Sequence, residues 1–355
     1  MATREADIPL SRDTVMGELQ AYGTASQQLN TWIAGEQALG LLRAAHAAGI
    51  LAATETPRTT NEIARVTGLD SQRAADILYA LNAHGVVKRE GEAYHLAANF
   101  ALLLAPTAFQ TLPDLLARSA MMAGVLEASV APDHAYTVLS AQDALVLARG
   151  AAPNPLSPVF VAYMGMVAAQ LPELRARWDA GARHIEFGCG AGGGLLGFVA
   201  AHLRLTAVGV EIHGTVLAEA RRRAEAVGIA DRVELRHADA LDGAEADTYD
   251  SAFWAQQFFA AASRPAMYAV VMRTLKPGGF LILPTFVPSE PPASEEALHT
   301  PAGQAYALSR IRFGHWGVPA LTADELHAEA EAAGFAFVRR APFSTSFLLL
   351  FQRPV

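Results

Sequence analysis

The feature that most constrains the fold of this chain is a glycine-rich turn that directly follows a short apolar run. Residues 184–194 are typical of the end of a buried strand, a tight turn and the start of a helix, which continues through 195–198. Gly188, Gly190 and Gly192 lack a Cβ and can adopt positive φ, so a ligand can lie directly against their backbone. The pattern therefore predicts a strand, a turn and a helix that together bind a small molecule.

Glu186 stands two positions before the first glycine, which is unusual for a turn that binds phosphate. The N-terminus of a helix attracts anions, and a carboxylate at this place competes with a phosphate for the same amide groups. The same carboxylate attracts an ammonium group. The turn therefore favours a ligand with an amino-acid moiety over a dinucleotide.

Five apolar runs in the second half of the chain alternate with helical stretches. They are 184–187, 206–210, 232–238, 249–254 and 280–283, and the last follows a Lys-Pro-Gly-Gly turn at 276–279. Runs of this length that alternate with helices predict a doubly wound, mostly parallel sheet of the α/β class, preceded by a mainly α-helical first domain. Ligands of such sheets bind beyond the carboxyl ends of the strands.

Acidic residues end two of these runs. Glu211 ends the second run, 19 residues after Gly192, where an acid can hold the two hydroxyl groups of a ribose. Asp239 ends the third run and is a candidate for adenine recognition. Structural alternatives stay open for each acid. Glu186 can pair with a basic neighbour, Glu211 can be an exposed strand end, and Asp239 can cap a turn.

In this order, the residues resemble class I S-adenosylmethionine-dependent methyltransferases. The resemblance covers roughly residues 155–355 and rests on Glu186, Gly188, Gly190, Gly192, Glu211, Asp239 and 276–279. It implies a Rossmann-like, seven-stranded sheet that binds S-adenosylmethionine. By this resemblance the three glycines line the methionine and ribose of the cofactor, Glu186 lies near its amino group and Glu211 holds its ribose hydroxyls. Asp239 and Ala240 face the adenine, and Trp254 completes the cofactor site.

The composition favours an intracellular enzyme over a nucleic-acid-binding or membrane protein. The chain has 355 residues, 52% apolar and 17% charged, as expected for two well-buried domains with a large subunit interface. A net charge of −8 argues against nucleic acid or an anionic membrane as the main partner. A single cysteine excludes an internal disulfide framework. Since neither a signal peptide nor a membrane span is recognisable, we expect a cytoplasmic protein.

The first domain, residues 1–100, is predicted to contain a winged helix after a long apolar helix. The predicted elements are helices at 27–52, 59–68 and 71–85 and short strands at 86–89 and 93–96. A helix that recognises DNA needs Arg or Lys, whereas the helix at 71–85 offers little besides Arg73 and lies near Asp70 and Asp76. DNA binding is therefore disfavoured.

This arrangement instead resembles the dimerisation domain of plant-type and bacterial small-molecule O-methyltransferases. The resemblance implies a homodimer in which helices of the first domain interlock between two subunits. Residues 101–155 are then a helical linker that contributes to the substrate chamber. The proline-rich passage 151–158 marks the boundary to the S-adenosylmethionine-binding domain at 156–355.

The general base expected of such an O-methyltransferase is absent. The family places a His just after the fourth strand, and the corresponding residue, 19 positions before Lys276, is Gln257. A glutamine amide orients or polarises a group but does not take a proton at neutral pH. Three alternatives stay open: the acceptor arrives ionised, a carbon atom accepts the methyl group, or the base comes from elsewhere.

His315 is the candidate for a base from elsewhere, because the segment 306–317 occupies the insertion that usually covers the acceptor. His315 can equally donate a hydrogen bond, bind a metal or have a structural role. A metal site needs three or more convergent ligands, and we expect none here. Arg310 and Arg312 in the same segment can pair with an acidic substrate or face solvent.

Aromatic and sulfur-containing side chains are the candidates for the acceptor pocket, although ordinary packing explains them equally well. They are Phe160, Tyr163, Met164, Phe258, Phe313 and Trp316. The sequence as a whole predicts methyl transfer to a small, largely apolar acceptor, with oxygen slightly favoured over carbon. The alternatives are an enzyme that binds the cofactor without methylating its substrate, and a regulator that senses the cofactor through the winged helix.

Overall fold

The chain divides into two compact units, Met1–Leu102 and Leu103–Val355. The computed structural model describes residues 11–130, 139–285, 290–343 and 346–355. The predicted linker 101–155 therefore lies almost entirely within the second unit. Among the described residues, none of the helices combines the length and apolarity needed to cross a membrane.

The first unit consists of helices and a small antiparallel sheet whose strands are in the order β1-β3-β2. Its elements are α1 (Arg12–Ala47), α2 (Ile50–Ala53), β1 (Arg58–Thr59), α3 (Thr60–Thr67), α4 (Ser71–Ala83), β2 (Val87–Glu90) and β3 (Ala93–Leu96). Helix α5 (Ala98–Leu104) runs across the division between the units. A capping box between Thr59 and Glu62 begins α3, and Gly68 ends it with φ of 72°. The predicted caps of this helix are confirmed.

The helix predicted at 27–52 is longer at its start and interrupted at its end. Helix α1 begins at Arg12, with Ser11 as its N-cap, and Gly49 separates it from α2 with φ of 73°. Leu42 and Ala45 are buried, but Trp32 is 63% exposed. The apolar face of α1 therefore reaches far beyond the core of the first unit.

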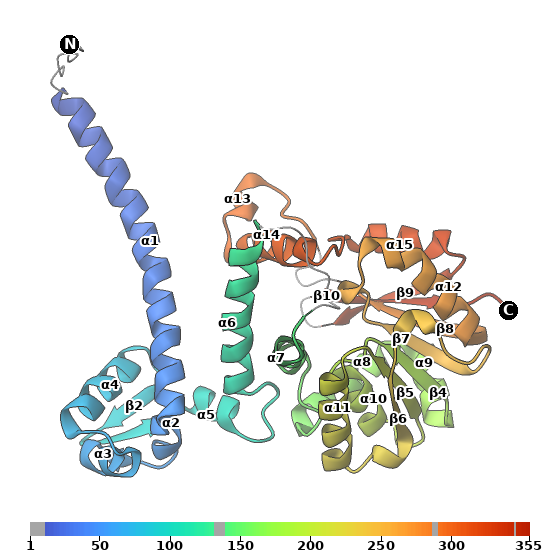
Figure 1. Ribbon diagram of the computed structural model, residues 1–355, viewed down its shortest axis with the longest axis horizontal. Helices are drawn as coiled ribbons and strands as arrows, with labels where there is room; N and C mark the ends of the chain where they lie inside the picture. The colour runs from blue at the N-terminus through green and yellow to red at the C-terminus, as the bar shows by residue number, and fades with distance from the viewer. Residues whose placement is uncertain (1–10, 131–138, 286–289, 344–345) are drawn as a thin grey trace. The chain divides into compact units, whose positions relative to one another are not determined.

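The second unit is built on a seven-stranded sheet with the strand order β6-β5-β4-β7-β8-β10-β9 (Figure 1). Its strands are β4 (Arg183–Phe187), β5 (Thr206–Glu211), β6 (Val233–His237), β7 (Tyr249–Trp254), β8 (Leu275–Pro284), β9 (Ala336–Phe343) and β10 (Ser346–Gln352). Neighbouring strands from β6 to β8 are parallel, and β10 is antiparallel to both β8 and β9. The predicted mostly parallel, seven-stranded sheet is confirmed.

Helices lie before, between and after these strands. They are α6 (Leu112–Ala128), α7 (Ala141–Ala151), α8 (Pro158–Ala169), α9 (Pro172–Ala180), α10 (Gly193–Ala201), α11 (Gly214–Val227), α12 (Arg264–Thr274), α13 (Glu295–Leu298), α14 (Pro301–His315) and α15 (Ala323–Ala332). Short 3₁₀ turns, η2 (Ala230–Arg232), η3 (Ala240–Asp242), η4 (Gln256–Phe258) and η5 (Ala261–Ser263), complete the connections.

Alternate residues of each central strand enter two separate cores, because successive side chains of a strand point to opposite faces. On β8, Phe280 and Ile282 join the core beside α8, α9 and α10. Leu281 and Leu283 join the core beside α12 and α15. Burial on both faces is why these strands read as continuous apolar runs in the sequence.

The Lys-Pro-Gly-Gly turn predicted at 276–279 lies within the bounds of β8, where the pairing with β7 shifts register between Leu275 and Phe280. The strand begins at Leu275, and Gly278 adopts φ of 73° within it. The Gly278 amide donates to the carbonyl of Arg353 at 3.0 Å, and the Arg353 amide donates to the carbonyl of Gly279 at 2.8 Å. The segment is therefore held in place by hydrogen bonds with the end of the chain, which no local pattern reveals.

A polar cluster is buried where β4 and β7 lie next to each other. The Trp178 indole donates to Ser251 Oγ at 2.9 Å, and Ser251 Oγ lies 2.8 Å from His184 Nδ1. The Ser251 hydroxyl has one donor and two acceptor lone pairs, so it accepts from the indole and still pairs with either tautomer of a neutral His184. Burial lowers the pKa of His184 to about 3, despite its contact with Ser251.

This cluster predicts a loss of stability in mild acid. The unfolded chain takes up a proton at His184 near pH 6.5, whereas the folded protein resists protonation until about pH 3. Stability therefore falls as the pH decreases through this window, by about 2 kcal/mol between pH 7 and 5 from His184 alone. Urea unfolding measures the free energy of unfolding at pH 7 and at pH 5. In His184→Gln the difference between these two free energies should be smaller than in the wild type by about 2 kcal/mol.

The matched control is His299→Gln, because His299 is exposed on the same unit. This variant should keep the pH difference of the wild type. An equal pH difference in the wild type and in His184→Gln would contradict the account.

Candidate functional site

A cavity of about 400 Å³ lies at the carboxyl ends of β4, β5, β6 and β7 in the second unit. The glycine turn after β4 lines one side of the cavity through Gly188, Gly190, Gly193 and Gly194. The segment 147–153 from α7 closes one side, and the segment 255–260 after β7 closes another. The cavity therefore occupies the place that the sequence predicts for a ligand.

The three glycines of the turn adopt the predicted positive φ. The angles are 75° at Gly188, 56° at Gly190 and 75° at Gly192. A Cβ built on Gly190 would meet no atom within 4 Å, so bare backbone faces open space. Gly192 itself does not line the cavity, since it is the N-cap of α10 and its added Cβ would lie 2.9 Å from Leu196.

Glu186 is a buried carboxylate without a counter-ion. It is 5% exposed and lines the cavity, and its Oε2 has no hydrogen-bond partner among the described residues. Burial, and then the charge of Glu211, raise the pKa of Glu186 to about 8. The alternative of a basic neighbour is not realised in the described part of the chain. A buried carboxylate in this state is a ready partner for a cationic ligand.

Glu211 is 3% exposed, so the alternative of an exposed strand end is wrong. Its Oε2 accepts the Gly190 amide at 3.0 Å, and its Oε1 accepts the His213 amide at 2.9 Å. These two bonds tie the glycine turn to the end of β5. Each carboxylate oxygen keeps further acceptor capacity, and Glu211 lines the cavity.

Asp239 combines a structural contact with a place on the cavity wall. Its Oδ1 accepts the Leu241 amide at 2.9 Å and begins the turn η3, so the predicted capping role is real. Asp239, Ala240 and Leu241 also line the cavity.

The two glutamines after β7 differ in their surroundings. Gln256 is fully buried, donates to the Pro284 carbonyl at 2.9 Å and accepts from Arg264 at 2.7 Å. Arg264 also pairs with Glu329, with 2.8 Å between Nε and Oε1. This network fixes the backbone, while Gln257 lines the cavity with an Oε1 that has no partner among the described residues.

Trp254 is not brought to the cavity. It is fully buried in the core beside α12, where its ring lies 4.9 Å from that of Tyr268 and 5.1 Å from the Arg264 guanidinium. Its position at the end of β7, which suggested a contact with the ligand, places it on the face of the sheet that packs against α12.

The predicted acceptor residues separate into two groups. Phe160, Met164, Phe258 and Trp316 line the cavity. Tyr163 packs against the first core and Phe313 against a cluster with Trp316, and neither lines the cavity. Phe259, which follows Phe258 in the sequence, also lines the cavity. The structure adds two aromatic residues that the sequence analysis did not assign to the site: Phe253 and Phe343.

His315 is buried at the end of α14 and does not line the cavity. The segment predicted as an insertion, 306–317, is mostly this helix. Among the described residues, no group of three or more His, Cys, Asp or Glu side chains is placed to hold a metal ion. Among the described residues that line the cavity, Cys189 is the one titratable side chain besides the acids. Burial raises the pKa of its thiol, which makes the thiol unreactive.

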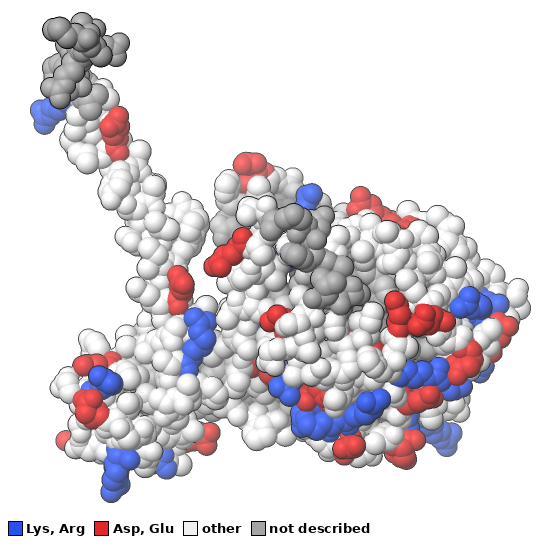
Figure 2. Space-filling view, in the orientation of Figure 1, with Lys and Arg blue, Asp and Glu red and all other residues white. Residues whose placement is uncertain are grey.

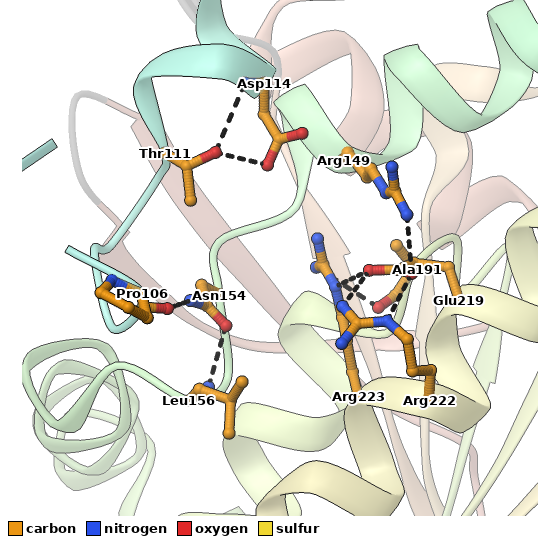
Figure 3. A network of polar contacts seen from close by, with 10 residues as sticks. All are labelled: Pro106, Thr111, Asp114, Arg149, Asn154, Leu156, Ala191, Glu219, Arg222 and Arg223. Carbon is orange, nitrogen blue, oxygen red and sulfur yellow. Dashed lines mark hydrogen bonds and ion pairs between the residues drawn. The ribbon is translucent and has the colours of Figure 1, made fainter. Parts of the chain in front are cut away.

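A charged network behind the glycine turn attaches α7 to α11. Figure 3 shows three guanidinium groups directed at Glu219, from Arg149 at 3.0 Å, Arg222 at 2.7 Å and Arg223 at 2.9 Å. Burial opposes ionisation, but these hydrogen bonds hold the pKa of Glu219 at about 2. Arg223 also reaches the Ala191 carbonyl at 3.5 Å. The network therefore supports the turn from behind and holds the wall that α7 provides.

Comparisons with known proteins agree with this geometry. Residues 185–279 match the family model of a methyltransferase domain. The uncharacterized protein YjhP of Escherichia coli (strain K12) is 27% identical over 143 residues, which are 40% of this chain and 54% of that protein. The chain thus spans about half of the length of this curated relative.

Solved structures share the fold over nearly the whole chain. An O-methyltransferase family protein from Burkholderia thailandensis matches with a TM-score of 0.68 and 18% identity, covering 93% of this chain and 98% of that one. Human N-acetylserotonin methyltransferase, solved in complex with SAM, matches with a TM-score of 0.70 and 16% identity over the same shares. At such identities the likeness concerns the fold.

Proposed function

We propose that this chain transfers a methyl group from S-adenosylmethionine to a small, largely apolar acceptor, because residues 185–279 match the model of a methyltransferase domain. The observation that carries the proposal is Glu186, a buried carboxylate with no counter-ion beside a turn of bare backbone. S-Adenosylmethionine has an ammonium group and a sulfonium, and a site of this kind favours a cation.

The residues of the cavity divide among the parts of the cofactor. Glu186 takes the ammonium group, and Glu211 uses its remaining acceptor capacity for the ribose hydroxyls. The segment Asp239 to Leu241 borders the adenine. The bare backbone at Gly190 admits the ligand without a side chain in the way. When bound, the cofactor supplies an electrophilic methyl group.

The acceptor side of the cavity positions its ligand and excludes water. Phe160, Met164, Phe258 and Trp316 make this side apolar. In-line displacement needs mainly the alignment of two reactants in a dry site. Gln257 can orient an acceptor through its amide but does not take a proton. The acceptor therefore arrives ionised, as an acidic phenol or enol, or presents a carbon nucleophile. Oxygen is favoured because the structural relatives include O-methyltransferase family members.

Two other functions are considered: an enzyme that binds the cofactor without methyl transfer, and a DNA-binding regulator that senses it. The absence of a base is compatible with an enzyme that binds the cofactor and converts its substrate without methyl transfer. Sensing of the cofactor by a DNA-binding protein is disfavoured, because Arg73 on α4 lies 3.7 Å from the carboxylate of Asp70.

The proposal predicts that proton release accompanies binding. In the empty protein Glu186 is mostly protonated at pH 7, and an ammonium group beside it favours the carboxylate. Affinity for S-adenosylmethionine should therefore increase from pH 6 to 8. Glu186→Gln should weaken binding by about 1.5–3 kcal/mol, as expected for a lost hydrogen bond between charged groups, and should abolish proton release. Calorimetry in two buffers of different ionisation enthalpy measures both effects.

Glu225→Gln provides the control, since Glu225 is an exposed acid on α11. It should bind with the affinity and proton release of the wild type. An affinity for S-adenosylmethionine that is unchanged in Glu186→Gln would refute the proposal that Glu186 binds the ammonium group of the cofactor.

A second prediction concerns the missing base. With methyl-labelled cofactor and a panel of phenols of graded acidity, the rate of label transfer should follow the ionised fraction of each phenol. Gln257→His should raise transfer to the weakly acidic phenols at pH 7 by about tenfold or more, because a general base then takes the proton. Gln257→Ala is the control and should give no increase.

Label transfer with equal rates to all phenols, irrespective of acidity, would contradict this reading of Gln257. Consumption of an acceptor without incorporation of label would instead establish the non-methylating alternative.

We also propose that α1 pairs with a second copy of the chain. Between Glu18 and Glu36 this helix has no charged residue, and its exposed apolar side chains include Leu19, Tyr22 and Trp32. Figure 2 shows α1 as largely uncharged, whereas acidic and basic side chains are mixed on the visible face of the second unit. An uncharged helical face of this length is typical of a protein interface.

The pairing predicts that Trp32→Glu weakens self-association by at least about tenfold, as expected when a central aromatic anchor of an interface is lost. Sedimentation equilibrium measures the dissociation constant, and Glu36→Gln on the same helix should leave it near the wild-type value. A wild-type protein that is monomeric at micromolar concentration would refute the pairing.

A further inference from the structure

We infer that the acceptor carries an oxyanion, such as a carboxylate, that Arg118 and Arg312 bind where α6, α7 and α14 meet. The inference rests on the proposed function and narrows the acceptor to an apolar acid. It stands on two arginines of the packed helices α6 and α14 that have no acidic partner among the described residues.

Arg118 lies on α6 and is held by α7. Its guanidinium donates to the Gly150 carbonyl, and a Cβ built on Gly150 would lie 2.6 Å from the Arg118 Cβ. A guanidinium has five N–H donors, and the Gly150 carbonyl is the one acceptor that Arg118 reaches among the described residues. No carboxylate of the described chain lies within ion-pair distance of it. The group is thus fixed in place with most of its donors unused.

Arg312 faces the same junction from α14. It is half-buried, its Nε has no hydrogen-bond partner in the described chain, and it forms no ion pair there. Burial, and then the nearby charge of Arg118, lower the pKa of Arg312. Like charges that are brought together out of water destabilise a fold unless an anion neutralises them.

Other arginines of the second unit show that this arrangement is unusual. Arg149 and Arg223 are held by Glu219, and Arg264 is held by Glu329. Arg232, which has no ion pair among the described residues, is held instead by the carbonyls of Val199, His202 and Leu205. The structural guanidinium groups of this unit are therefore satisfied by carboxylates or by several carbonyls. Arg118 and Arg312 have neither among the residues described, which is the pattern of a site that awaits an anionic ligand.

The two arginines lie next to the apolar wall of the cavity. Helical spacing puts Arg118 on the face of α6 that carries Met121 and Met122. Arg312 lies in the last turn of α14, four residues before Trp316, which is the C-cap of that helix. The two methionines and Trp316 pack in one cluster, and Trp316 lines the cavity. Figure 1 shows α6 and α14 adjacent to each other, in agreement with their packing.

A ligand that extends past Trp316 therefore reaches the guanidinium groups about one helical turn, or roughly 6 Å, further along α14. Two guanidinium groups bind a carboxylate, sulfonate or phosphate through paired N–H donors. The apolar wall requires that the remainder of the acceptor be aromatic or aliphatic. The reacting group then lies beside Gln257 and the oxyanion at the far end.

The test compares two fluorescent probes that share an aromatic skeleton and differ in one sulfonate, 8-anilinonaphthalene-1-sulfonate and N-phenyl-1-naphthylamine. The full-length protein is titrated with each probe in the presence of saturating S-adenosylhomocysteine. The wild type should bind the sulfonated probe more tightly. Arg312→Gln and Arg118→Gln should each raise the dissociation constant of the sulfonated probe about tenfold, as for a lost charge-assisted hydrogen bond, and leave that of the neutral probe unchanged.

Arg310→Gln is the matched control, because Arg310 is exposed two residues before Arg312 on the same helix. It should change neither constant. Arg312→Gln keeps the contact of Arg118 with Gly150, so it tests the site even where Arg118→Gln fails to fold. A ratio of the two constants that is unaltered in Arg312→Gln, or altered equally in Arg310→Gln, overturns the inference.

Calorimetric titration of the same proteins with S-adenosylhomocysteine separates this inference from the function on which it rests. A wild type that does not bind this compound refutes the proposed function itself. A wild type and variants that bind it equally, with no selectivity for the sulfonated probe, refute the anion site alone.

Discussion

Two carboxylates buried next to each other, Glu186 and Glu211, are the constraint on which the rest of the site depends. Glu211 is secured by the amides of Gly190 and His213 and keeps the glycine turn against β5. Glu186 has no such partner, and burial beside a second acid holds it largely protonated in the empty protein. An arrangement of this kind destabilises the empty fold and is relieved by a cationic ligand. The empty protein is therefore less stable because of these two acids, and binding of a cation removes this cost.

The surrounding elements hold the two acids and the glycine turn in place beside the apolar part of the cavity. The Glu219 network supports the turn from behind and holds α7 as a wall, and the Arg264–Glu329 pair fixes the segment that carries Gln257. Neither network reaches the cavity with its own charge. The polar groups that do reach it are few and separated by aromatic surface, so a reactant is oriented by shape and by a small number of hydrogen bonds.

Local patterns predicted the parts of this site that depend on neighbours in sequence. Positive φ at Gly188 and Gly190, the strand end at Glu211 and the place of Asp239 just after β6 follow from turn chemistry and strand length alone. Residues that reach the site through distant pairing were not predictable in this way. Phe343 comes from β9 and the wall at 147–153 from α7, and no motif marks either.

The predictions that differ from the structure have the same physical origin. Trp254 follows the alternation of β7 into the core beside α12, and His315 ends a helix whose orientation the sequence does not specify. The turn at 276–279 lies inside the bounds of β8 and forms hydrogen bonds with the end of the chain. In each case a tertiary contact overrides a local preference.

The central claim is that the unpaired Glu186 carboxylate receives the amino group of the cofactor. A crystal structure of the protein with S-adenosylhomocysteine tests it most directly. The account predicts that the amino nitrogen lies about 3 Å from an Oε atom of Glu186, the distance of a charge-assisted hydrogen bond. A bound ligand whose amino group faces away from Glu186, with that carboxylate still unpaired, would contradict it.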